Sequence, residues 1–129
     1  MNIELAIEKL SDSHQLVSEA IDRERSEWLP ERPPLTIIML TVGRSIAQNI
    51  AEISDEDKRV IFELVDELLL KGNEAVKDSV ATGLLEALLG LASDGKFDFS
   101  EIAPFLGSEA KRYCIAWDRF TGCKTAGLY

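Results

Sequence analysis

Apolar residues, together with one histidine, recur every three or four positions through the first 28 residues, which is the repeat of one helical face. These positions are Ile3, Ile7, Leu10, His14, Val17, Ile21 and Trp28. The pattern predicts a single first helix over about residues 2–27. It must end in "WLPERPPL", because prolines remove hydrogen-bond donors and disfavour helix in the residues before them. Residues 30–34 are therefore expected to form a Pro-rich connection.

The same repeat resumes after the prolines and marks two further helices. The second carries Leu35, Met39, Val42, Ile46 and Ile50 in register. The third begins with Ser54 as N-cap and Asp57 three residues later, and the acids in its first turn suit the helix dipole. Gly72 follows its last turn and is the expected C′ residue, the position at which glycine commonly ends a helix.

A fourth helix is predicted from about Asn73 to Ala92, with Gly83 inside it. Glycine weakens a helix by about 1 kcal/mol relative to alanine, so another helix is expected to approach closely at Gly83. A short helix over 100–106, interrupted by Pro104, and a last helix from Ser108 complete the pattern.

No segment alternates apolar and polar residues as a strand does, and no internal repeat is evident. The expected fold class is therefore all-α: one domain built as a bundle or a short solenoid-like stack of about five to six helices. Its helical core is expected over residues 35–122. Residues 123–129 lack periodicity and are expected to form an extended or mobile tail.

Composition and charge narrow the classes of partner. The chain carries 23 acids against 14 bases, a net charge of −9, which argues against nucleic acid as a direct partner because that binding depends on Lys and Arg neutralising phosphates. A basic protein is the expected partner instead; the competing interpretation is that the negative charge serves solubility alone. No apolar run is long enough to span a bilayer, and the start "MNIELAIEKL" does not read as a signal peptide. We therefore expect a cytoplasmic protein that does not contact membranes.

The segment "AEISDEDKRVIFELVDE" concentrates carboxylates that can present a negative surface to such a partner. The candidate partner-binding residues are Glu52, Asp55, Glu56, Asp57, Glu63, Asp66 and Glu67. The competing interpretation is structural, because Ser54 and the acids that follow it also cap and solvate the start of a helix.

The stretch "GLASDGKFDFSE" matches the second half of an EF-hand calcium loop, with Asp94, Gly95 and Glu101 at its fifth, sixth and twelfth positions. Its first half fails, because Gly90 and Ala92 stand where the first two carboxylates belong. Calcium needs six to eight oxygen ligands, so no metal is expected here.

Helix boundaries explain this stretch better. Gly95 is expected to end one helix and Ser100 to cap the next. Phe97 and Phe99 are alternate residues of an extended link that can place an aromatic ring in the core.

The remaining candidate chemistry is sparse. His14 is the only histidine, and its place on the apolar face predicts a hydrogen-bonded, partly buried side chain. Cys114 lies on an apolar helical face and is expected to be a buried free thiol, and Cys123 is also expected to be unpaired. No nucleophile elbow, phosphate loop or zinc motif is present, so we expect neither an enzyme nor a cofactor.

The second half of the chain resembles a family of small, uncharacterised bacterial helical proteins. The resemblance covers about residues 60–128 and is carried by "DELLLKGNEAVKDSVATGLLEALLG" and "PFLGSEAKRYCIAWDRFTGCKTAGL". Proteins of this kind have the size and acidity of immunity proteins in bacterial toxin systems, including contact-dependent inhibition. The resemblance implies that the chain binds and neutralises a cognate toxin.

Four residues of the matching motifs are singled out: Gly83, Glu86, Trp117 and Asp118. A half-buried acid usually needs a partner. Glu86 and Asp118 are therefore expected to bind Arg112, Arg119 or the Trp117 indole, and structural roles are expected for both acids.

Three functions remain open at this point. The leading hypothesis is an immunity protein that occludes a basic toxin domain such as a nuclease. The alternative is a non-enzymatic helical adaptor or scaffold with an unrelated partner. The third is a small enzyme, which would need several acids with shifted pKa values converging in one pocket.

Overall fold

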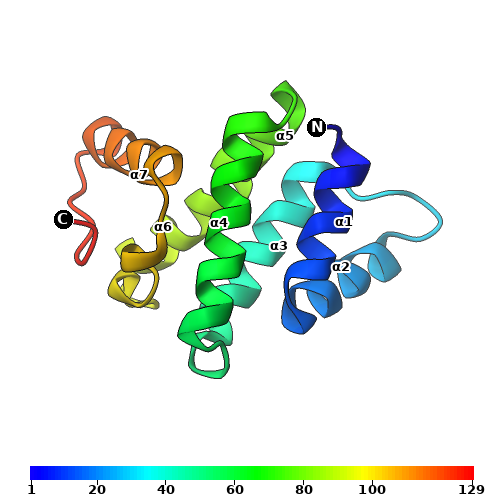
Figure 1. Cartoon of the computed structure of the whole chain (residues 1–129), viewed down its shortest axis with the longest axis horizontal. Helices are drawn as coiled ribbons and strands as arrows, with labels where there is room; N and C mark the ends of the chain where they lie inside the picture. Colours follow the sequence, from blue (N-terminus) through cyan, green and yellow to red (C-terminus); the bar gives the residue numbers. More distant parts are fainter.

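Helices account for all the regular secondary structure of the computed structural model, which describes residues 1–129 (Figure 1). The α-helices are α1 (Ile3–Ser13), α2 (Gln15–Trp28), α3 (Leu35–Gln48), α4 (Asp55–Lys71), α5 (Glu74–Ser79), α6 (Glu86–Ser93) and α7 (Ser108–Thr121). Short 3-10 turns η1 (Ile50–Glu52), η3 (Phe99–Glu101) and η4 (Ala103–Phe105) connect them, and a π-helical segment η2 (Val80–Leu85) joins α5 to α6. The predicted all-α class is confirmed.

Helix α4 runs through the middle of the molecule, in front of α3 and of the α5–η2–α6 segment in the view of Figure 1. Helices α1 and α2 lie on one side of it and α7 with the C-terminal tail on the other. One hydrophobic core of 27 buried residues draws on every α-helix from α1 to α7. The core includes the fully buried side chains of Leu10, Ile21, Met39, Phe62 and Leu88.

The tightest helix packing occurs between α3 and η2, where each contributes one glycine. A Cβ atom at Gly83 would lie 2.7 Å from the carbonyl oxygen of Thr36, and one at Gly43 would lie 2.6 Å from that of Leu84. Real Cβ atoms do not tolerate such contacts, so only glycine permits this approach of the two backbones. The close approach predicted at Gly83 is confirmed, and Gly43 is its unpredicted counterpart on α3.

The prediction of a single first helix over residues 2–27 is wrong, because the helix is interrupted at His14. This residue is extended (φ −165°, ψ 144°), and its Nδ1 atom accepts a hydrogen bond from the amide of Leu16 as the N-cap of α2. Its Nε2 atom lies 3.3 Å from Oδ2 of Asp57 on α4, and the side chain is 14% exposed. The expected hydrogen-bonded, partly buried histidine is therefore present, but at a helix boundary.

Two other expected helix ends also differ from the structure. Gly72 follows α4 with φ −65°, so it is not a left-handed C′ residue; a Cβ there would overlap Leu68 and Val76. Asp98 rather than Ser100 caps η3, accepting from both the amide and the hydroxyl of Ser100. Ser54 does cap α4 through the amide of Asp57, as predicted.

The link between α6 and η3 otherwise follows its predicted pattern. Gly95 has φ +73° just after α6, the conformation that glycine adopts without strain. Phe97 and Phe99 are both buried and meet edge to face, with ring centroids 6.4 Å apart.

The C-terminal tail is not the loose end that its missing periodicity suggests. Thr125 and Leu128 are buried, and Leu128 belongs to the main core. Gly127 lies so close to Ser100 that a Cβ would come within 2.8 Å of its backbone nitrogen. The tail folds back onto α7 and η3, because two of its side chains and its backbone reach the carboxylate of Asp118.

Candidate functional site

The candidate site is the solvent-facing side of α4 and of the η1 turn before it. We define the outer face of α4 by the exposed acidic and apolar residues Glu52, Asp55, Glu56, Val60, Glu63 and Leu70; the same helix also exposes the bases Arg59 and Lys71. Positions 56, 60, 63 and 70 share one side of the helix because they are separated by three, four and seven residues. In the view of Figure 1 no other element crosses in front of α4, and the exposure of these side chains shows that no element covers them. The outer face is therefore open to a partner.

The seven predicted carboxylates divide into two groups on this scaffold. Three of them bind other parts of the chain. Asp57 lies beside His14, Glu67 accepts a hydrogen bond from Lys9 of α1 at 3.1 Å, and Asp66 accepts one from the amide of Ala110 at 2.9 Å. Since these contacts join α4 to α1, α2 and α7, the carboxylates of this group hold the fold together.

Glu52, Glu56 and Glu63 form the second group, and none of them takes part in an ion pair of the chain. Asp55 is intermediate, with Oδ1 at 3.7 Å from Nζ of Lys58 while its side chain stays 76% exposed. The acidic surface that the sequence predicts is thus smaller than expected, because tertiary contacts use almost half of its members.

Asp66 also explains why α7 begins after a glycine. The N-cap residue of α7 is Gly107, which offers no capping side chain, and Asp66 accepts from the first-turn amide in its place. A Cβ at Gly107 would overlap the carboxyl group of Asp66. The charge of Asp66 also suits the positive end of the helix dipole.

Two basic residues border the outer face without neutralising most of it. Lys58 is buried to 5% exposure, with Nζ at 3.1 Å from Oε2 of Glu101. Arg59 is exposed, and its guanidinium carbon lies 5.4 Å from the ring centroid of Phe105 on η4. Lys58 thus meets η3 and Arg59 lies over the Phe105 ring of η4, and neither forms an ion pair with Glu56 or Glu63.

Sequence reasoning missed the apolar members of the outer face. Val60 is 46% exposed and Leu70 is 58% exposed. Both fall outside the inward series Ile61, Val65 and Leu68, so a helical projection of α4 would have identified them as outward apolar residues.

Glu86 and Asp118 of the resemblance motifs both accept hydrogen bonds within the chain, but their partners differ from the expected ones. Oε2 of Glu86 accepts a hydrogen bond from the hydroxyl of Tyr113, and burial followed by the charge of Glu86 raises the pKa of Tyr113 to about 12. Asp118 is buried and accepts from the amide and hydroxyl of Thr125 and from the hydroxyl of Tyr129. The expected arginine partners are therefore wrong for both acids. Trp117 is partly buried and packs against the core.

The cysteines follow the prediction. Cys114 is a buried free thiol and Cys123 is a partly exposed one. Burial raises the pKa of Cys114 to about 12, and the nearby charge of Asp118 acts in the same direction.

The acids of the calcium-like stretch have other partners. Asp98 binds Ser100, which lowers the pKa of its carboxyl, and Glu101 pairs with Lys58. No group of three or more His, Cys, Asp or Glu side chains is placed to hold a metal ion. No helix combines the length and the apolar character needed to cross a membrane.

Comparison with known proteins places the chain in a family. Neither a curated protein nor a solved structure matches it. The family model that matches covers residues 7–122. With nearly its whole length matched, the chain belongs to the family described as Domain of unknown function (DUF7674).

Proposed function

We propose that this protein is an immunity protein that binds a basic toxin domain, such as a nuclease, through the outer face of α4. The observation that carries the proposal is the unpaired state of Glu52, Glu56 and Glu63 on an uncovered helix, in a chain of net charge −9. Binding there would cover the basic active site of the toxin and prevent its substrate from entering.

The composition of the outer face favours a protein as the partner. Protein interfaces combine an apolar centre with a polar rim. On α4, Val60 lies between Glu56 and Glu63, four residues after one and three before the other, and Leu70 continues the same side. The apolar side chains would supply buried area, while the carboxylates would raise the rate of encounter with a basic surface.

Contacts with neighbouring helices fix the position of α4. Asp57, Asp66 and Glu67 bind residues of α1, α7 and the start of α2. These contacts position the backbone that carries the free carboxylates. A surface held in this way loses little conformational entropy on binding. The proposal places the protein in the cytoplasm, where a toxin delivered into the cell would act.

The first test is whether a large secreted protein with a toxin-like C-terminal domain is encoded next to this gene, and the second is coexpression with that domain. We expect a complex on size exclusion and protection of growth. In Glu56→Lys/Glu63→Lys, the association rate at low salt should fall by about tenfold or more, because like charges then meet. The matched control is Asp22→Lys/Glu27→Lys, which makes the same change of net charge at exposed positions of α2.

Equal effects of the two double variants would show that net charge, rather than the outer face of α4, governs binding. Absence of both complex and protection would end the immunity hypothesis. Capture of an unrelated protein that depends on Glu56 and Glu63 would instead support the adaptor alternative.

A further inference from the structure

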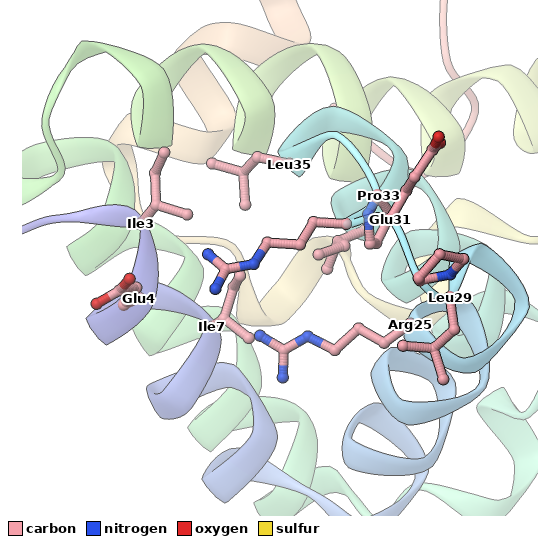
Figure 2. A pocket seen from close by; sticks show the side chains of 11 residues that line it. Ile3, Glu4, Ile7, Arg25, Leu29, Glu31, Pro33 and Leu35 are labelled. Atoms are coloured by element: carbon pink, nitrogen blue, oxygen red, sulfur yellow. The ribbon is translucent and has the colours of Figure 1, made fainter.

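A pocket of about 630 Å³ lies away from the outer face of α4, between the start of α1, the end of α2, the Pro-rich connection and the start of α3 (Figure 2). Ligand pockets in proteins commonly have volumes of about 300–1,000 Å³. Pro30 and Pro33 of the connection line this pocket, at the place where the chain passes from α2 to α3.

Apolar side chains and two prolines make up most of the pocket wall, which also includes two carboxylates, Glu4 and Glu31, and two arginines, Arg25 and Arg32. Ile7 and Ile38 belong to the core and form its inner side, while Ile3 and Leu35 extend it along α1 and α3. Leu29 is 72% exposed although it is a large apolar side chain at the pocket. An apolar ligand would cover Leu29 and the outer part of Ile3, and the hydrophobic effect would favour its binding.

Two arginines line the same pocket and neither has an acidic partner. No ion pair of the chain includes Arg25 or Arg32. In Figure 2 the side chain of Arg25 extends from α2 toward Ile7 on α1, while the carboxylate of Glu31 points away from it. The two guanidinium groups therefore place positive charge beside the apolar side chains of the pocket, in a chain that has 14 basic residues against 23 acids.

We propose that this pocket binds an amphipathic carboxylate, with the apolar body between α1 and α3 and the carboxylate on Arg25 and Arg32. Arginine suits this role because its planar guanidinium can donate two parallel hydrogen bonds to one carboxylate. The ligand can be a free aliphatic acid or the C-terminal carboxylate of a polypeptide that ends in an apolar residue, since both present the same chemistry. The proposal does not depend on the function of α4.

The test uses the full chain with octanoate and, as its neutral counterpart, 1-octanol. We expect octanoate to shift the methyl NMR signals of Ile3, Ile7, Leu35 and Ile38, and to bind about tenfold or more tightly than the alcohol, because charge-assisted hydrogen bonds are lost with the carboxylate. Arg25→Gln/Arg32→Gln should remove this preference. Arg23→Gln/Arg44→Gln is the matched control, since it changes the same charges at exposed positions outside the pocket.

A short peptide that ends in leucine, with a free or an amidated C-terminus, distinguishes the two sources. Tighter binding of the free peptide than of its amide, with the same dependence on Arg25 and Arg32, would assign the site to a polypeptide C-terminus. Tighter binding of octanoate alone would assign it to a free acid. Absence of shifts at the pocket methyl groups with both carboxylates, or retention of full affinity in Arg25→Gln/Arg32→Gln, would overturn the proposal.

Discussion

Two ionisable groups are buried at the end of the molecule formed by α7 and the tail, whereas those on the outer face of α4 are exposed to solvent. At the α7 end, Cys114 and Asp118 are buried, and Asp118 accepts hydrogen bonds from Thr125 and Tyr129. On α4, Glu56 and Glu63 remain in water without partners. A buried carboxylate is tolerated only where donors surround it, whereas a solvated one costs nothing to the fold and is free to bind another molecule. Substitutions of the buried groups at the α7 end should therefore lower the free energy of unfolding, whereas substitutions on the outer face of α4 should change it little.

The thiol of Cys114 should show the largest effect. With a pKa of about 12, only about one thiol in ten thousand is ionised at pH 8, and the thiolate is the reactive form. In Cys123→Ser, we expect labelling of Cys114 by a disulfide reagent to be about a thousandfold slower than labelling of an unfolded control in urea. Fast labelling of Cys114 in the folded chain would contradict its enclosed position.

Because the pKa of Cys114 is raised in the folded chain, we expect the free energy of unfolding to fall at alkaline pH. An unfolded cysteine ionises near pH 9, its ordinary value, while the folded one keeps its proton until about pH 12. This contribution to the free energy of unfolding is therefore complete below pH 9 and is lost as the pH rises from 9 toward 12. Urea titrations of the parent and of Cys114→Ala across this range should show a shallower decline in the variant.

Asp118→Ala should be the most destabilising of the carboxylate substitutions. It leaves the amide and hydroxyl of Thr125 without their buried acceptor and frees the tail, so the free energy of unfolding should fall by about 3 kcal/mol. Urea unfolding measures the change. Tyr129→Phe, which removes a single hydrogen bond from an exposed side chain, should cost clearly less than Asp118→Ala. Equal losses in the two variants would show that the carboxylate does not organise the tail.

Asp66→Ala should have an intermediate effect, because Asp66 serves both α4 and α7. Loss of its hydrogen bond to the amide of Ala110 removes the cap of α7, and caps contribute about 1 kcal/mol, with a range of about 0.5–2. The matched control is Glu63→Ala, one turn earlier on the same helix and without a partner. If both substitutions changed the urea midpoint equally, the division between structural and free carboxylates on α4 would be wrong.

Glu56→Gln/Glu63→Gln should leave stability within about 0.5 kcal/mol of the parent, because neither side chain contacts another charged group of the chain. Thermal unfolding at low and high salt provides the measurement. A clear loss of stability would show that these carboxylates have a structural role, and the outer face would no longer differ from the α7 end.

Calcium should have no effect on the chain. Asp98 and Glu101 are already bound to Ser100 and Lys58, and the loop lacks the first two carboxylates of an EF-hand. We expect calorimetry to show no calcium binding at millimolar concentrations. Heat from stoichiometric binding that disappears in Asp94→Asn would reverse this expectation.

Local features of the chain were predictable because their causes lie within a few residues. The helical repeat identified α3, α4 and α7, and the capping residue Ser54 marked the start of α4. Gly83 signalled a close helix contact, because a glycine inside a helix needs a compensating interaction. The acidic segment pointed to α4 as a charged surface, although three of its seven carboxylates bind other parts of the chain and Asp55 lies near Lys58 of the same helix.

Sequence by itself thus determined the all-α class, most helix boundaries, the buried thiol and the general place of the acidic surface, since periodicity and capping act over one or two turns. Tertiary structure decided the break at His14, the acceptor role of Asp118 and the division of the α4 carboxylates. It also brought Arg25 and Arg32 to one apolar pocket. These outcomes depend on which side chains of distant helices meet, and a local pattern of apolar and polar residues does not specify that.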